Sequence, residues 1–278
     1  MELSFPDTVA ADHYENFPVA SILLPDRLRR PIALIYRFAR EADDFADEGD
    51  APDATRLAQL GAFTRELQRI ERGEAPGIAW FADLALIIRE HQLPLAAFHD
   101  LLSAFAQDVT QKRYADYAAV LDYCRRSADP IGRLLLVLYG AATPQNLVYS
   151  SAICSGLQLI NFWQDVAIDW QKNRVYFPQD EMQRYGITET QIAGGDANEA
   201  WQRFMTFQIN RTRELLYSGR PLGRILKGRI GLEMRTIIAG GDRILSKIAA
   251  VNGDVFRHRP VLTKSDWVLM LAKSLLRI

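Results

Sequence analysis

Residues 158–178 read QLINFWQDVAIDWQKNRVYFP, and this stretch predicts a buried helix that carries one narrow polar stripe. Apolar side chains point in most directions around it, and a helix that is apolar almost all round is buried. The stripe consists of Gln158, Asn161, Asp165 and Asp169. Because buried carboxylates and amides need partners, we expect this stripe to line an internal cavity.

A second pair of carboxylates, Asp43 and Asp47, has the same four-residue spacing in the segment READDFADEGD. Residues four apart share one face of a helix, and like charges placed there repel each other by about 0.2–0.5 kcal/mol. Pro31 and Gly49 predict that this helix covers about 31–48. Taken alone, such an acidic face could simply be solvated. Together with the buried pair it indicates Mg²⁺, which binds carboxylate oxygens, water and substrate phosphates.

A substrate that carries a diphosphate fits both acidic pairs. Metal ions stabilise a departing diphosphate as Lewis acids and as a clamp. Arg40 beside the first pair and Arg174 after the second can add charge-assisted contacts to phosphate oxygens. The reaction we expect is ionisation of an allylic or cyclopropylcarbinyl diphosphate to a carbocation.

The two acidic segments resemble those of the squalene and phytoene synthases, a family of the trans-prenyltransferase-like superfamily. The matching positions in IYRFAREADDFAD are Tyr36, Arg40, Asp43, Asp44 and Asp47. The matching positions in the second segment are Gln158, Asn161, Gln164, Asp165, Asp169, Arg174, Tyr176 and Pro178. The resemblance runs from about His13 to Trp267. It implies an all-α, isoprenoid-synthase-type helical bundle around a central cavity, dependence on several Mg²⁺ ions and an isoprenoid diphosphate substrate.

Two departures from the family pattern resemble a narrower subgroup, the bacterial hydroxysqualene synthases of hopanoid pathways. In condensing members of the family a tyrosine stands shortly after a cysteine, whereas the segment YCRRSADPIG has Arg126 at that position. The same segment has Ser127-Ala128-Asp129 where condensing members have Val-Ala-Gly. Near Gly241 relatives offer a tyrosine, and its loss could enlarge the pocket or admit water. The opening DHYENFPVASILLP also resembles this subgroup. The subgroup converts presqualene diphosphate and water to hydroxysqualene and diphosphate.

The resemblance also implies a set of site residues. The expected Mg²⁺ ligands are Asp43, Asp44, Asp47, Asp165 and Asp169, with Gln164 as a supporting residue. The expected diphosphate-binding residues are Arg40, Lys112, Arg113, Arg174 and Gln158. The expected catalytic residues are Tyr36, Asn161, Arg126 and Tyr176. For Arg126 an ion pair with Asp129 is an equal alternative to a role in product control.

Two other functions stay open at this stage. Within the same fold, the chain could condense two farnesyl or geranylgeranyl diphosphates head to head, giving presqualene diphosphate, squalene or phytoene. In another class, it could be a non-enzymatic helical assembly factor, although such a protein has little reason to keep two acidic pairs. No dinucleotide-binding motif is present, but two-step squalene synthases bind a nicotinamide cofactor without one. The resemblance to the hydroxysqualene synthases, rather than this absence, implies that water quenches the cation and that no nicotinamide cofactor is needed.

The composition is that of a compact enzyme with one domain over residues 1–278. The 33 basic and 34 acidic residues nearly balance, so nothing indicates a nucleic acid partner. Cys124 and Cys154 lack disulfide or metal-site spacing, and the N-terminus has no signal-peptide pattern, so we expect the cytoplasm. The short basic clusters at 27–30 and 257–259 are expected to be solvated.

The rest of the chain predicts helix after helix. Helical spacing covers residues 54–72, 79–91, 94–109, 117–126, 197–218 and 228–250. The uncharged run 134–164 predicts two buried helices with a turn near Thr143-Pro144 rather than a membrane span. Residues 265–278 are apolar with two basic residues and predict either the last core helix or an interfacial helix. An interfacial helix would bring the enzyme to the inner membrane face. A further possible partner is an upstream presqualene diphosphate synthase that hands over its product directly.

Overall fold

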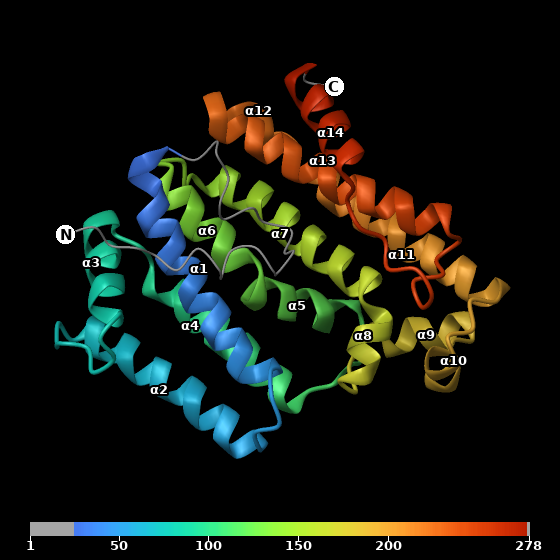
Figure 1. The fold of residues 1–278 in the computed structure, drawn as a ribbon, viewed down its shortest axis with the longest axis horizontal. Coiled ribbons are helices and arrows are strands. Elements are labelled where there is room, and N and C mark those ends of the chain that lie inside the picture. The colour runs from blue at the N-terminus through green and yellow to red at the C-terminus, as the bar shows by residue number, and fades with distance from the viewer. Residues whose placement is uncertain (1–24, 277–278) are drawn as a thin grey trace.

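The computed structural model describes residues 25–276 and confirms the all-α prediction (Figure 1). The first helices are α1 (Asp26–Asp47), α2 (Asp53–Glu71), α3 (Phe81–His91), α4 (Leu95–Thr110), α5 (Tyr117–Ser127), α6 (Asp129–Leu138) and α7 (Pro144–Gln164). The others are α8 (Val166–Gln171), α9 (Gln179–Tyr185), α10 (Glu189–Gly194), α11 (Glu199–Ser218), α12 (Leu222–Ile225), α13 (Gly228–Ala250) and α14 (Lys264–Leu276). The segment DHYENFPVASILLP lies, apart from its last proline, outside the described residues.

Helix α7 is the centre of the bundle, where it contacts α5, α6, α11, α12 and α13 (Figure 1). Its start is encoded locally, because Thr143 caps the backbone N–H of Asn146 and Pro144 occupies the first turn. Helix α6 ends before Gly140, which has a φ of 66°. The predicted turn between two buried helices is therefore confirmed.

The buried side chains form two clusters that meet at α6. One cluster gathers α1 to α4 and includes Leu134 and Leu138 of α6. The other gathers α5, α7, α11 and α13 and includes Leu136 of α6. Leu134 and Leu138 face one cluster and Leu136 faces the other, so α6 joins the two halves of the core.

Helix α1 begins at Asp26, five residues before the predicted start, because an acidic residue in the first turn suits the helix N-terminus. Its apolar side is buried as expected, with Ile35, Phe38 and Ala42 at most 2% exposed. The acidic side is only partly buried. The predicted division of this helix into an apolar back and a polar front is confirmed.

The prediction of one helix through both Asp165 and Asp169 is wrong. Helix α7 ends at Gln164, Asp165 adopts φ −105° and ψ 15°, and α8 starts at Val166. The chain then forms β2 (Val175–Pro178), which pairs in parallel with β1 (Arg113–Tyr114). This short pairing places two segments about sixty residues apart in the sequence next to each other. Asp165 therefore lies between α7 and α8, whereas Asp169 lies on α8.

Helix α14 packs on α13, and within the described part of the chain no helix is both long and apolar enough to cross a membrane. Helices α12 and α14 lie together at the upper end of Figure 1.

The glycine at position 241 does not open a pocket, which corrects the sequence-based expectation. A Cβ atom on Gly241 would lie 3.0 Å from methyl groups of Leu157 and Ile160 and 3.1 Å from one of Leu216. The space that a side chain at position 241 would occupy is therefore filled, because α13 lies close to α7 and α11. Interiors packed this closely do not absorb added volume without strain.

We expect Gly241→Val to lower the free energy of unfolding by about 1–3 kcal/mol, because three side chains would have to move. Urea unfolding measures this. Gly61→Val on α2 is the control, since only the end of Arg65 lies near that position, and we expect a change of at most about 0.5 kcal/mol. Equal losses in the two variants would contradict close packing at Gly241.

Candidate active site

The acidic face of α1 is neutralised by basic side chains. Arg40 Nη2 lies 2.8 Å from Asp44 Oδ1, and Arg40 Nη1 lies 3.8 Å from Asp43 Oδ2. Both carboxylates are partly exposed, one turn of helix from the guanidinium. The expected clustering of Arg40 with the first acidic pair is present, and Tyr36 lies one turn earlier on the same helix, partly buried.

Asp47 at the end of α1 joins the second motif directly. Arg174 Nη1 lies 2.5 Å from Asp47 Oδ1, and Lys172 Nζ lies 3.3 Å from Asp47 Oδ2. Arg174 is only 5% exposed, and its Nη2 also donates to the backbone carbonyl of Asp108. Its Nε is buried without a hydrogen-bond partner. A guanidinium held on two sides with one donor unused is suited to bind an anion.

Asp165 forms an ion pair that the sequence did not indicate. Arg259 Nε lies 2.5 Å from Asp165 Oδ1, and Arg259 Nη2 lies 3.1 Å from Oδ2. The adjacent Gln164 donates to the Pro260 carbonyl. Residues 257–259 are exposed, as expected, but Arg259 also forms this ion pair. No periodicity or spacing relates positions 94 residues apart, so no sequence signal could have found this contact.

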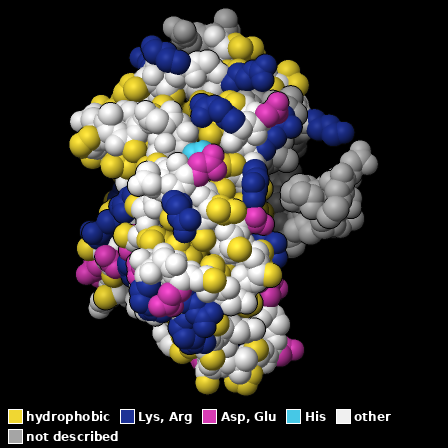
Figure 2. All heavy atoms as spheres, turned by 90° about the vertical axis from the view of Figure 1, so that its left-hand side faces the viewer, with side chains coloured by type: hydrophobic (Ala, Val, Ile, Leu, Met, Phe, Trp, Pro, Cys, Tyr) yellow, Lys and Arg dark blue, Asp and Glu magenta, His cyan; other side chains and the backbone are white. Residues whose placement is uncertain are grey.

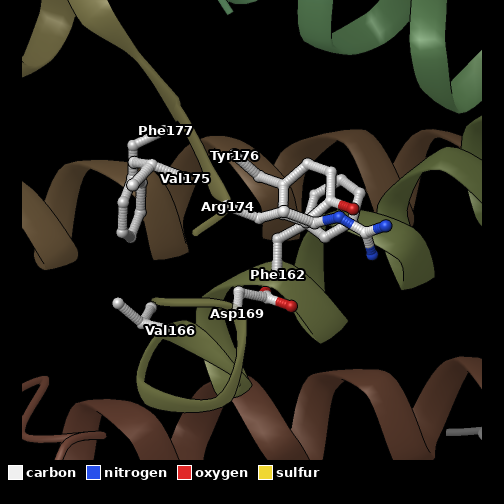
Figure 3. Close-up of a pocket in the computed structure, with 7 residues that line it drawn as sticks. All are labelled: Phe162, Val166, Asp169, Arg174, Val175, Tyr176 and Phe177. Atoms are coloured by element: carbon white, nitrogen blue, oxygen red, sulfur yellow. The ribbon is translucent and has the colours of Figure 1, made fainter. Parts of the chain in front are cut away.

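Asp169 on α8 lies among charges from both motifs. Burial raises its pKa well above the ordinary range, and the carboxylates of Asp165 and Asp47 raise it further while Arg174 lowers it. A cavity of about 10 Å³, room for about one water, is lined by Asp169, Arg174 and Tyr176. Figure 3 shows the Arg174 and Tyr176 side chains extending side by side above Asp169. Asp47 of the first predicted pair and both aspartates of the second therefore come together here.

The donor set fits Mg²⁺, although the carboxylates are now paired with arginine. Among residues 25–276 no group of three or more His, Cys, Asp or Glu side chains is arranged to hold a metal. Mg²⁺ commonly takes only one or two protein carboxylates and completes its octahedron with water and substrate phosphates. Burial raises the pKa of Asp169, and the nearby carboxylates of Asp165 and Asp47 raise it further, so together they supply a negative field that such a cation relieves.

Asp108 of α4 is a buried carboxylate that sequence reasoning missed. It is 3% exposed and accepts hydrogen bonds from the hydroxyls of Tyr123 and Tyr176, the second at 3.3 Å. Burial raises its pKa to about 6, opposed by Arg174 and the Tyr123 hydrogen bond. Its backbone carbonyl also accepts from Lys112 Nζ. A single acidic residue within an apolar helical pattern, as in SAFAQDVTQ, was the only available signal.

The aromatic residues around Asp108 form one wall of the site. Tyr176 stacks on Phe162 with ring centroids 3.7 Å apart and planes 4° apart. Tyr114 and Tyr123 lie against Tyr176 at 5.7 Å each. A buried hydroxyl needs a hydrogen-bond partner, and Asp108 accepts from that of Tyr176. This hydrogen bond and the stacking on Phe162 together fix the position of the Tyr176 ring.

Lys112 is brought to the site, whereas Arg113 is not. Burial lowers the pKa of Lys112, as does Arg174, whereas Asp108 and Asp47 raise it. Arg113 instead pairs with Glu189 through its Nε at 2.5 Å and Nη2 at 2.9 Å, and it donates to the Asn173 carbonyl. In the structure Arg113 is therefore engaged with Glu189 and Asn173, and its role in binding diphosphate stays a prediction.

Gln158 and Asn161 behave as the polar stripe predicted. From Ile153 to Gln164 they are the two residues that are not fully buried. Between these positions, the side of α7 that carries them is therefore its more accessible side.

Arg126 does not pair with Asp129. It donates instead to Asp122, one turn earlier on α5, and to Gln107 Oε1 at 2.6 Å. Gln107 in turn lies 3.4 Å from the Tyr114 hydroxyl. Asp122 is closer than Asp129 because four residues on one helix share a face. Arg126 thus reaches the aromatic wall through one intervening side chain.

Asp129 has its own buried environment at the start of α6. It is 5% exposed and accepts from Ser155 Oγ at 2.8 Å. Burial raises its pKa to about 6 despite hydrogen bonds from Ser155 and Ser151.

Comparison with known proteins matches almost the whole chain. The sequence model of the squalene/phytoene synthase family matches residues 10–266. Hydroxysqualene synthase of Rhodopseudomonas palustris is 38% identical over 233 residues, 83% of this chain and 78% of that protein. The same enzyme of Sinorhizobium fredii is 32% identical over 268 residues, 96% and 89% of the two chains. The crystal structure of squalene synthase HpnC from Alicyclobacillus acidocaldarius has a TM-score of 0.80 and 32% identity, covering 87% and 91%.

We expect Asp129→Asn to stabilise the protein above neutral pH. An aspartate in the unfolded chain titrates near about 3.9, so the native state binds the Asp129 proton more tightly. The stability due to this group is present below about pH 4 and is lost as the pH rises through about 6. The asparagine avoids this loss, giving a gain of as much as about 3 kcal/mol near pH 7.5 and little change near pH 4.

Urea unfolding at the two pH values measures the difference. Asp50→Asn, at an exposed position, is the matched control and should change stability by at most about 0.5 kcal/mol at both. A variant less stable than the parent protein near pH 7.5 would mean that the Asp129 carboxylate stabilises the fold.

Proposed function

The chain belongs to the squalene/phytoene synthase family of isoprenoid synthases, and on that premise we propose that it is a Mg²⁺-dependent hydroxysqualene synthase. The substrate is presqualene diphosphate. The bond from carbon to the diphosphate oxygen breaks, the cyclopropylcarbinyl cation rearranges, and water adds to the cation with release of a proton. Hydroxysqualene and diphosphate are the products, and no reductant is consumed.

The observation that carries the proposal is the meeting of the two acidic motifs around Arg174. Asp47 from α1 is in direct contact with Arg174, and the Asp169 carboxylate interacts electrostatically with both Asp47 and Asp165. Bound Mg²⁺ would supply Lewis acidity to the departing diphosphate. Asp43, Asp44, Asp47, Asp165 and Asp169 are the residues proposed to hold it. A helical assembly factor would have little reason to keep Asp169 buried near Asp47 and Asp165, because burial and nearby like charges disfavour its charged form when no cation is bound.

Basic side chains on the same side support diphosphate binding. Arg174 has a buried, unused Nε donor, and Lys112 has its ammonium group beside the Asp108 carbonyl. Arg40 completes the set on α1. Charge-assisted contacts from these groups would orient the leaving group so that ionisation occurs against the aromatic wall of Phe162 and Tyr176.

The choice of product rests on the relatives and on Arg126. Two relatives with more than 30% identity are hydroxysqualene synthases. Arg126 stands where condensing members carry a tyrosine, and its contact with Gln107 links it to the Tyr114 hydroxyl. We assign Arg126 as a positioning residue for the aromatic wall that controls how the cation is quenched.

Purified protein incubated with Mg²⁺ and presqualene diphosphate, without any reductant, should release a triterpene alcohol that mass spectrometry identifies as hydroxysqualene. EDTA should abolish this turnover, because the departing diphosphate would lose its counter-charge. Arg126→Ala should increase the ratio of hydrocarbon to alcohol by about tenfold while leaving substrate binding within about twofold.

Farnesyl diphosphate supplied alone is the control. Its consumption would support head-to-head condensation in place of water capture. An Arg126→Ala enzyme with unchanged turnover and unchanged product ratio would remove Arg126 from product control, and the exposed variant Arg125→Ala gives the baseline for this comparison.

Metal and diphosphate binding can be measured without turnover. Saturating Mg²⁺ with inorganic diphosphate should raise the melting temperature, since a ligand present at about 100 times its Kd adds about 2.7 kcal/mol. Asp169→Asn should remove most of this shift, because the carboxylate next to Asp47 and Asp165 is lost.

Asp100→Asn, on α4 and away from both acidic motifs, is the matched control and should keep the full shift. A melting temperature of Asp169→Asn that still rises by the full amount would contradict the assignment of Asp169 as a metal ligand. Mg²⁺ alone and diphosphate alone should each give a smaller shift than the two together.

A further inference from the structure

Helix α14 exposes its apolar side. Val268 and Leu275 are 69% and 66% exposed, and Leu269 and Leu271 are also exposed. Positions 268, 271 and 275 are three and four residues apart, so they lie in one row along the helix. In a helix that only covers a core this row would face inward.

The inner side of α14 is attached to α13 by polar contacts. Asp266 is 3% exposed and pairs with Arg243 Nε at 2.6 Å and with Lys247 Nζ at 2.5 Å. Near the other end, Arg235 Nε donates to the Ser274 carbonyl at 2.9 Å. Ion pairs to a buried carboxylate fix which side of a helix faces in, because removing either partner leaves a charge uncompensated. The outward position of the apolar row is therefore built into the packing.

A basic surface lies beside this row. Arg224, Lys227 and Arg229 are exposed, form no ion pair with any described residue, and belong to a stretch, 220–232, without an acidic residue. Arg235 also donates to the Gly223 carbonyl at 2.6 Å, so one side chain holds α12 next to the end of α14. Ile225 of α12 adds an exposed apolar side chain. Figure 2 shows Lys and Arg side chains with hydrophobic ones at this upper end of the molecule, and few acidic ones.

We propose that the outer row of α14 and the basic residues around α12 form a docking surface for an anionic lipid membrane. Val268, Leu271 and Leu275 enter the boundary between headgroups and acyl chains, while Arg224, Lys227 and Arg229 contact lipid phosphates. An interfacial helix combines these two features, an apolar face and flanking Lys or Arg. With 13 residues α14 is too short to span a bilayer and lies in the plane of the surface.

The charges favour a membrane over a second copy of the chain. A two-fold interface places the same patch on both subunits, so Arg224, Lys227 and Arg229 would face the same basic residues of the other copy. An anionic surface instead pairs with all three. This inference goes beyond the proposed function, since it concerns where the protein lies and not which reaction it catalyses.

Vesicle flotation with the full chain tests the proposal. Vesicles of phosphatidylcholine with about one third phosphatidylglycerol should bind the protein at least about tenfold more tightly than phosphatidylcholine alone, and added salt should weaken this binding. Val268→Gln with Leu275→Gln should lower the affinity about tenfold or more. Both positions are exposed, so the melting temperature should stay unchanged. Leu86→Gln, at a position of α3 that is 53% exposed, is the control and should bind as the parent protein does.

The basic residues are tested separately. Lys227→Ser with Arg229→Ser should lower affinity for the anionic vesicles about tenfold or more and leave binding to phosphatidylcholine within about twofold. Arg65→Ser with Arg89→Ser, which removes two exposed positive charges from α2 and α3, should change neither.

Three results would overturn the proposal. The first is that the protein does not bind anionic vesicles. The second is that the test and control variants lose the same amount of vesicle affinity. The third is that sedimentation velocity shows a dimer, which the double variant Val268→Gln with Leu275→Gln converts to a monomer. The last result would make this surface an interface between copies. Binding is read without substrate, so a failure here is independent of whether the enzyme makes hydroxysqualene.

Discussion

The contact on which the site depends is the ion pair between Arg174 and Asp47. Arg174 follows α8, Asp47 ends α1, and the same guanidinium donates to the Asp108 carbonyl on α4. Three segments from different parts of the chain are thus held by one buried cation. Because a buried charge without partners is costly, the position of each segment is fixed by the need to keep Arg174 compensated. The carboxylates around it are close enough to raise the pKa of Asp169, which is the electrostatic condition for a bound divalent cation.

Helix α7 positions the polar groups of the candidate site at its C-terminal end. From Ile153 to Gln164 it is buried except at Gln158 and Asn161, which are partly exposed, and the helix ends one residue before Asp165. Asp165 lies at the junction of α7 and α8, and Asp169 follows it on α8, with its backbone N–H donating to the Asp165 carbonyl at 2.8 Å. The parallel pair β1 and β2 then returns the chain to the end of α4, next to Lys112 and Asp108. The polar groups proposed to bind diphosphate therefore gather at one end of an apolar helix.

The polar end and the outer surface match the properties of an amphiphilic substrate. A long isoprenoid diphosphate needs cations for its headgroup and apolar contact for its chain. The first requirement is met around Arg174, and the aromatic wall of Phe162, Tyr123 and Tyr176 adjoins it. The exposed row on α14 with the neighbouring basic residues offers the same combination at the surface of the molecule. Both follow from one principle, that anionic headgroups bind basic side chains while apolar surface leaves water.

The sequence by itself determined the helical class, the boundaries of most helices, the burial of the second motif and the two acidic pairs, because periodicity and capping are local properties. It predicted that Arg40, Asp47, Asp169, Arg174 and Lys112 share one site, and the structure brings Asp47, Asp169, Arg174 and Lys112 near one another. It did not indicate the buried Asp108, the ion pair of Arg113 with Glu189 or that of Arg259 with Asp165, and of its two alternatives for Arg126 the pair with Asp129 is absent. Arg113 with Glu189, Asp108 with Tyr176 and Arg259 with Asp165 are contacts between positions 76, 68 and 94 residues apart. Only the tertiary structure decides which arginine meets which carboxylate, since every such pair is chemically equivalent until packing brings two of them together.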